Sequence, residues 1–248
     1  MRKLIGRELI ESGLWVTNWG TLVAPIVAEH ALLLTLSALR NQAAWPRSLT
    51  HNREEPKSSL QTRTLHGKRI ALHGFGAIAQ ALIALLRPFN PHLTAFSTGM
   101  PRELIRQSGV ETAPDLATLC RDADVLISCE ALTPLTAREL SYEILSELPA
   151  GSVFINVGRG GVVDEAALFR VVRERSLRVG IDVFGEEPLA ADSPYVSLPD
   201  AILSPHIGGP THDYYGPCGA HALANLAAFR RGETPQGLIT PAIYDRST

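Results

Sequence analysis

Three ionisable residues could do chemistry together, because each one directly follows a predicted strand. They are Arg159 in Gly-Arg-Gly-Gly, Glu187 in Gly-Glu-Glu-Pro and His206 in Pro-His-Ile-Gly-Gly. The preceding strands are predicted at 153–157, 179–183 and 201–203. Taken singly, each residue also has a structural interpretation, as a solvated arginine, a surface glutamate or a structural histidine. Parallel strands end at one edge of a sheet, where ligands bind, so we expect the three side chains to meet there.

This trio suits the reduction of a 2-oxo acid. An arginine fork can hold the carboxylate and polarise the ketone. A histidine near neutral pH can give a proton to the developing alkoxide, and a neighbouring glutamate would stabilise the charged imidazole. The hydride itself would come from a cofactor. Arg159, Glu187 and His206 are therefore the candidate catalytic residues.

A glycine-rich loop supplies a place for such a cofactor. Gly74-Phe75-Gly76-Ala77-Ile78-Ala79 reads GxGxxA, directly after a predicted strand and at the start of a predicted helix. Gly74 would permit the tight turn, Gly76 the close approach of a pyrophosphate, and Ala79 the packing of helix on strand. The helix N-terminus would offer free N–H groups to the phosphates. The alternative is a purely structural glycine turn, but the context favours a dinucleotide.

The choice between NAD and NADP stays open. The loop's usual partner is an acidic residue about 20 positions later, which binds the ribose hydroxyls. That place falls on Ser97, followed by Thr98, with Arg102 nearby. A serine can still bind a ribose and does not repel a 2′-phosphate. Arg102 is either a phosphate ligand or a solvated helix residue.

The elements around these residues alternate between strand and helix. We predict further strands at 69–73, 92–96 and 125–128, and helices at 77–86, 116–121, 139–148 and 221–230. Another predicted helix, capped by Asp164, carries Leu168, Val171 and Val172. This order predicts an α/β fold, a doubly wound Rossmann-type parallel sheet covered on both faces. Before it we expect a helix within 1–13, a short strand at 14–16 and a helix at Val27–Leu39 that is apolar on nearly every side. Residues 41–65 are polar and proline-containing, as in a surface excursion.

Composition narrows the class of protein. The 248 residues are 45% hydrophobic with a formal net charge of −2, which predicts a globular core and neither a nucleic-acid partner nor a membrane partner. No signal peptide is recognisable, and the three cysteines have neither CxxC nor zinc-ligand spacing, so we expect reduced thiols and a cytoplasmic location. The eight histidines form no HExxH-like pair, so we predict no metal site.

With these motifs, the sequence resembles the D-isomer-specific 2-hydroxyacid dehydrogenase family, including phosphoglycerate dehydrogenases and glyoxylate/hydroxypyruvate reductases. Seven stretches match in the family's order, from about Leu14 to the closing helix. Besides the GxGxxA loop they are Val16-Thr17-Asn18, Val27-Ala28-Glu29-His30-Ala31, Leu132-Thr133-Pro134, 155–165 (Ile-Asn-Val-Gly-Arg-Gly-Gly-Val-Val-Asp-Glu), 182–189 (Asp-Val-Phe-Gly-Glu-Glu-Pro-Leu) and 204–209 (Ser-Pro-His-Ile-Gly-Gly).

The resemblance implies a role for each matching residue. Arg159 resembles the substrate-binding arginine, Glu187 the glutamate paired to the acid/base, and His206 the acid/base itself. Asp182 matches the aspartate that holds the nicotinamide carboxamide. Taken together with the glycine loop and the strand ends, the predicted NAD or NADP contacts are Gly74, Phe75, Gly76, Ala77, Ile78, Ser97, Glu130, Val157, Gly158, Arg159, Asp182, His206, Gly208 and Gly209. The substrate would be a small 2-hydroxy or 2-oxo acid, and the Val27–Leu39 helix would form a homodimer.

The chain also departs from the family pattern. Ser97 replaces the usual aspartate, and Cys129-Glu130-Ala131 stands where His-x-Pro is common. We predict that residues 1–24 are a remnant of the flavodoxin-like substrate domain with its hinge, 25–210 the dinucleotide-binding domain and 211–248 a C-terminal helix and tail. Three interpretations follow: an active oxidoreductase, a catalytically inactive dinucleotide-binding and dimerising remnant, or a chain whose substrate domain is encoded upstream.

Overall fold

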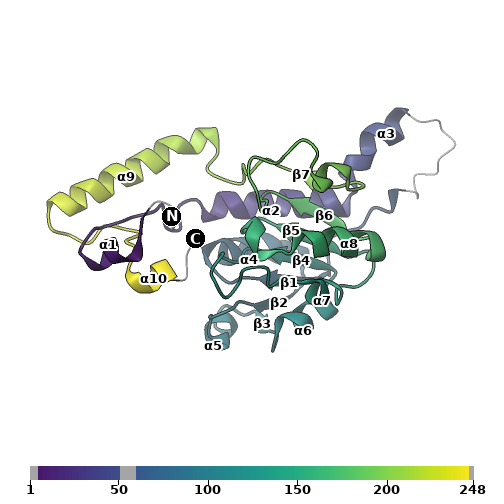
Figure 1. Ribbon diagram of the computed structural model, residues 1–248, viewed down its shortest axis with the longest axis horizontal. Helices are drawn as coiled ribbons and strands as arrows, with labels where there is room; N and C mark the ends of the chain where they lie inside the picture. Colours follow the sequence, from purple (N-terminus) through teal and green to yellow (C-terminus); the bar gives the residue numbers. More distant parts are fainter. Residues whose placement is uncertain (1–4, 51–59, 246–248) are drawn as a thin grey trace.

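The computed structural model describes residues 5–50 and 60–245. Its centre is one sheet of seven parallel strands in the order β3-β2-β1-β4-β5-β6-β7 (Figure 1). The strands are β1 (Arg69–His73), β2 (His92–Phe96), β3 (Glu111–Thr112), β4 (Val125–Ser128), β5 (Val153–Asn156), β6 (Arg178–Ile181) and β7 (Ile202–Leu203). Because the chain builds outward from β1 in both directions, the strand order reverses between β1 and β4. In folds of this kind, ligands bind beyond the carboxyl ends of the strands at such a reversal.

Helices cover both faces of the sheet. On one face lie α2 (Ala24–Leu39) and α4 (Ala77–Leu86), together with the short α5 (Arg102–Arg106). On the other face lie α6 (Leu116–Arg121), α7 (Tyr142–Leu145) and α8 (Glu165–Arg175). Alternate strand residues feed the two cores: Val153 and Ile155 face α2, whereas Phe154 between them faces the other layer. The predicted doubly wound Rossmann-type fold is confirmed.

Most predicted elements form close to the expected bounds, and three differ, two of them helices. The predicted 139–148 helix is reduced to α7, a single turn. Helix α9 (Tyr215–Arg230), predicted at 221–230, begins earlier because residues 215–220 continue the same helix. Of the 41–65 excursion, the 3₁₀ turn η1 (Gln42–Ala44) and α3 (Trp45–Thr50) are described, while residues 51–59 lie outside the described part of the chain.

The two ends of the described chain pack against each other. Helix α1 (Arg7–Glu11) contacts α10 (Pro241–Asp245), and Ile10, Ile239 and Tyr244 form a small core of their own. The predicted strand at 14–16 is wrong: this segment meets residues 237–239 through one isolated bridge, between Thr17 and Leu238. A strand needs a continuous partner ladder, and one bridge does not provide it. The division into domains at residues 24 and 210 stays a prediction.

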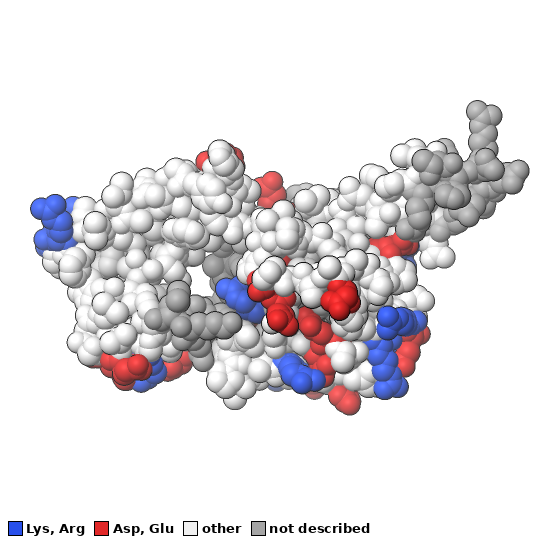
Figure 2. All heavy atoms as spheres, turned by 45° about the horizontal axis from the view of Figure 1, so that its top comes forward, with Lys and Arg blue, Asp and Glu red and all other residues white. Residues whose placement is uncertain are grey.

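The two long helices differ in burial. Helix α2 packs on α4, β5 and β6, which explains most of its apolar surface, but Leu33 remains 54% exposed. Helix α9 projects away from the sheet in Figure 1, and its Leu223, Leu226 and Phe229 are exposed. In Figure 2 the left side of the molecule, which carries α9, is mostly uncharged, while residues of both signs gather on the right half of the face shown. Among the described residues, no helix combines the length and apolar character needed to cross a membrane.

Candidate functional site

The carboxyl edge of the sheet brings Glu187 and His206 together. Although they are 19 positions apart, the Nδ1 atom of His206 lies 2.7 Å from the Oε2 atom of Glu187. His206 has a φ of +55°, in the left-handed region that a residue with a side chain seldom adopts. Its backbone N–H is held by the carbonyl oxygens of Asp182 and Ser204. Backbone strain held in place by hydrogen bonds is typical of functional sites.

Asp182 fixes the loop that presents His206. This aspartate follows β6 and is only 2% exposed. Its carboxylate accepts hydrogen bonds from the hydroxyl of Ser204 at 2.6 Å, and from the backbone N–H groups of Ile207 at 3.0 Å and Gly208 at 2.9 Å. The Nε2 atom of His30, on α2, lies 3.2 Å from the same carboxylate. Asp182 therefore joins β6, α2 and the 204–208 loop into one rigid unit.

The carboxyl groups of Asp182 and Glu187 are both held in their charged form. Burial would raise the pKa of Asp182, but hydrogen bonds from His30, Ser204, Ile207 and Gly208 outweigh it, and the net pKa is lowered. The same balance applies to Glu187: burial opposes ionisation, while the hydrogen bonds from His206 and the Phe184 N–H prevail and lower the pKa. Glu187 therefore presents a carboxylate to the Nδ1 atom of His206.

Arg159 completes the predicted trio from the loop after β5. Its guanidinium is half-buried and donates a hydrogen bond to the carbonyl oxygen of Gly158. Burial lowers the pKa of Arg159, and the charge of Glu187 acts in the opposite direction; the side chain stays cationic at neutral pH. Asn156, which the sequence analysis did not single out, shapes this loop: its side chain accepts from the Gly158 N–H and donates to the Arg159 carbonyl oxygen.

The glycine loop fits a dinucleotide. Gly74 has a φ of +96°, and a Cβ atom there would lie 2.6 Å from the backbone nitrogen of Glu130. At Gly76, the N-cap of α4, no described atom other than its chain neighbours and its own helix backbone lies within 4 Å of the place where a Cβ would project. No side chain caps this helix. Open space and free N–H groups at a helix N-terminus are what a pyrophosphate requires.

Two predicted cofactor contacts are limited to the backbone. Phe75 and Val157 are each 3% exposed, and their side chains belong to the core under α2 and α4. Because both side chains are buried, only the main-chain atoms of these two residues are left for contacts with a ligand. Arg102, named as a candidate phosphate ligand, donates to the carbonyl oxygen of Pro114, next to β3.

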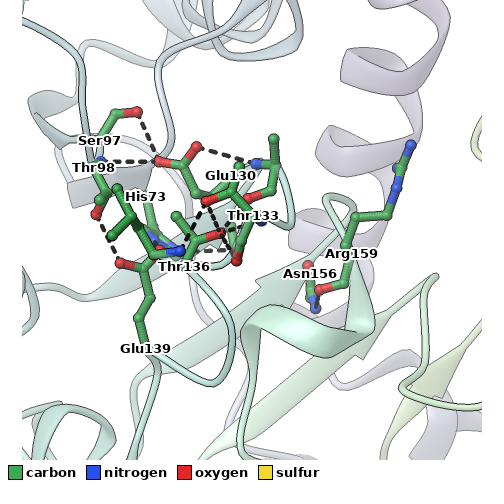
Figure 3. Close-up of polar contacts among 12 residues, drawn as sticks. His73, Ser97, Thr98, Glu130, Thr133, Thr136, Glu139, Asn156 and Arg159 are labelled. Carbon is green, nitrogen blue, oxygen red and sulfur yellow. Dashed lines mark hydrogen bonds and ion pairs between the residues drawn. The ribbon is translucent and has the colours of Figure 1, made fainter. Parts of the chain in front are cut away.

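A polar cluster lies at the ends of β1, β2 and β4, as Figure 3 shows. The carboxylate of Glu130 accepts from the Ser97 hydroxyl at 2.7 Å and from the Thr98 N–H at 3.2 Å. Glu139 accepts from the Thr98 hydroxyl at 2.7 Å and lies 2.9 Å from the Nε2 atom of His73. Ligating atoms of His73, Glu130 and Glu139 all lie within 4.8 Å of one another, a spacing that could also hold a metal ion.

No sequence motif points to His73 and Glu139 in this cluster. The one signal in the sequence is a histidine that ends a strand whose middle residues, 70–72, are apolar. From the sequence we predict no metal site. Among the described residues, however, His73, Glu130 and Glu139 form a group whose spacing could hold a metal ion. Figure 3 shows Arg159 apart from this cluster, nearer to α2.

A small pocket lies beside the Glu187–His206 pair. It measures about 260 Å³ and is lined mainly by apolar side chains, including Phe184, Leu189 and Leu203.

The three cysteines are free, and burial raises the pKa of Cys120 to about 12. That thiol is therefore protonated at neutral pH and unsuited to nucleophilic chemistry.

Comparison with known proteins gives consistent results. The family model for the D-isomer specific 2-hydroxyacid dehydrogenase NAD binding domain matches residues 32–208. A D-3-phosphoglycerate dehydrogenase of Methanocaldococcus jannaschii is 29% identical over 230 residues, which cover 92% of this chain and 44% of that protein. A glyoxylate reductase of Pyrococcus furiosus is 30% identical over 244 residues, covering 95% of this chain and 72% of that one.

A solved structure agrees with both relatives. The crystal structure of the TT0316 protein from Thermus thermophilus superposes with a TM-score of 0.81 at 29% identity, covering 94% of this chain and 73% of that chain. The chain thus spans less than half of the phosphoglycerate dehydrogenase and about three quarters of the other two proteins.

Proposed function

The chain belongs to the D-isomer specific 2-hydroxyacid dehydrogenase family, and from this premise we propose that it is an NAD(P)-dependent oxidoreductase interconverting a D-2-hydroxy acid and its 2-oxo acid. One observation carries the proposal: the 2.7 Å contact between His206 and Glu187 lies at the same sheet edge as the open glycine loop. A proton donor and a dinucleotide site at one edge are the two parts that this reaction needs.

Each residue of the chain has a defined task in this proposal. Gly76, Ala77 and Ile78 would hold the pyrophosphate, and the bound dinucleotide supplies or accepts the hydride. Arg159 binds the substrate carboxylate and polarises the carbonyl group. His206 gives its Nε2 proton to the developing alkoxide, and takes it back in the oxidative direction, while Glu187 holds Nδ1. Asp182 orients His206 through the 204–208 loop.

Turnover tests this assignment directly. The purified chain should oxidise NADH or NADPH in the presence of glyoxylate or hydroxypyruvate, followed by absorbance at 340 nm. His206→Asn should lose at least about a hundredfold in kcat, since a positioned general acid contributes about 10²–10⁴-fold. His92→Asn, an exposed histidine at the start of β2, is the control and should retain activity. Cofactor binding without any turnover in the unaltered protein would reject the proposal.

A second candidate function is a dinucleotide-binding module without turnover. The observation that favours it is exposure: the side chains of His206 and Glu187 are 46% and 34% exposed. Hydride-transfer sites usually exclude water when they close, and this edge is open to solvent in the described residues. Calorimetric titration with each dinucleotide would then show binding, while the turnover assay stays silent.

We also propose that the chain forms a homodimer through the Val27–Leu39 helix and resides in the cytoplasm. The exposed Leu33 on α2 supports the dimer, together with Trp45 and Leu49 on the adjoining α3, which are 44% and 86% exposed. Free cysteines support the location. Light scattering should give twice the chain mass, and Leu33→Asp should give monomers whereas Leu223→Asp, on α9, should not.

A further inference from the structure

We propose that Glu130 makes this site select NAD over NADP, by providing from the end of β4 the carboxylate that the end of β2 lacks. The inference rests on the proposed function, because it concerns how the same dinucleotide is recognised. Ser97 alone leaves the choice between NAD and NADP open, because a serine discriminates poorly between a ribose hydroxyl and a 2′-phosphate.

The sheet order places Glu130 where it can do this. β1 lies between β2 and β4, so a residue after β4 must cross the end of β1 to reach the end of β2. Glu130 makes that crossing: its backbone packs so closely on Gly74 that a Cβ there would lie 2.6 Å from the Glu130 nitrogen. Its carboxylate then meets Ser97 and Thr98, the first residues after β2. This is the location at which an acidic residue binds the adenosine ribose in such folds.

The hydrogen bonds of Glu130 leave one acceptor position for a ribose hydroxyl, and the carboxylate offers no donor to a phosphate. Its Oε2 atom accepts from Ser97 and Thr98, and its Oε1 atom accepts from the Ala131 N–H at 3.0 Å. A carboxylate has about four acceptor positions, so one remains for a ribose hydroxyl. Ser97 gives its proton to Glu130 and keeps its lone pairs for the neighbouring hydroxyl. A 2′-phosphate would bring only acceptor oxygens and about two negative charges against these acceptors.

Neighbouring groups hold Glu130 in place without cancelling its charge for a ligand. Glu130 and Ser97 retain 8% and 9% exposure, while His73 is fully buried, with its two ring nitrogens against Ser128 and Glu139. His73 therefore cannot reach a phosphate. Arg102 is engaged by the carbonyl oxygen of Pro114. Arg102 is the cation that the sequence suggested as a ligand for a 2′-phosphate, and its guanidinium is directed at Pro114 instead.

Fluorescence titration of the full chain with NADH and NADPH tests the proposal. We expect NADH to bind at least about tenfold more tightly, corresponding to about 1.4 kcal/mol. Glu130→Gln keeps the size of the side chain, removes the charge and adds an N–H donor, so the NADH preference should shrink by about tenfold. Glu143→Gln, at the exposed start of α7, is the matched control and should leave the preference unchanged.

Each alternative outcome has a distinct meaning. Equal or tighter binding of NADPH by the unaltered protein would overturn the role of Glu130 while leaving the proposed function intact; this arm needs no variant and no assumption about folding. A preference unchanged by Glu130→Gln would overturn it as well. So would stoichiometric Zn²⁺ binding that Glu130→Gln abolishes, because the carboxylate would then be a metal ligand. Binding of neither dinucleotide would reject the proposed function together with the inference.

Discussion

Replacing Asp182 should be among the most damaging single changes in this protein, for a reason that can be quantified. In Asp182→Ala the Ser204 hydroxyl and the N–H groups of Ile207 and Gly208 lose a common charged acceptor. Hydrogen bonds to a charged group contribute about 1.5–3 kcal/mol each. They are not additive, and breaking a buried ionic contact costs about 3–5 kcal/mol. We therefore expect a loss of about 4 kcal/mol in the free energy of unfolding.

Urea unfolding followed by circular dichroism measures this loss. With a slope of about 3 kcal/mol/M, the midpoint should fall by about 1.3 M. Asp182→Asn keeps one acceptor oxygen and should lose about half as much. Asp192→Ala, on an exposed loop, is the control and should change stability by less than about 0.5 kcal/mol. If Asp182→Ala unfolds at the same urea concentration as this control, the carboxylate does not anchor the loop and the reasoning fails.

Three further outcomes follow from the same structure. Glu187→Gln should lower kcat by about tenfold or more with little change in KM, because the charge beside His206 is lost; an effect on KM alone would contradict the assigned role. Stability should fall as pH drops below about 4, since the lowered folded-state pKa values of Asp182 and Glu187 let the unfolded chain bind more protons there. Acid titration of unfolding should show a shallower fall in Asp182→Asn, and an identical fall would refute the linkage. Leu34→Ala, in the core between α2 and β6, should cost about 2–5 kcal/mol in urea unfolding, whereas Leu223→Ala, at an exposed position of α9, should cost under about 1 kcal/mol; equal losses would contradict the packing.

The predicted elements that match the structure are those whose own residues show the pattern expected of a strand or helix. The apolar runs at β1, β4 and β5 are buried on both faces of the sheet, and a strand of that kind is apolar throughout its length. The predicted strand at 14–16 failed because it depended on a distant partner. The segment 14–16 is apolar enough for a strand, yet its only bridge is Thr17 with Leu238, more than two hundred positions away. Periodicity in a short stretch cannot reveal whether such a partner exists.

For the site, the sequence by itself determined the chemical groups and their order: a glycine turn before a helix, and a guanidinium, a carboxylate and an imidazole after successive strands. Only the tertiary structure decided which of these groups touch. The contact between Glu187 and His206 depends on β6 and β7 being neighbours in the sheet. The contact of Glu130 with Ser97 spans 33 positions and depends on β1 lying between β2 and β4. Hydrogen bonding acts over about 3 Å of space whatever the separation along the chain, so strand order sets these pairings and local composition does not.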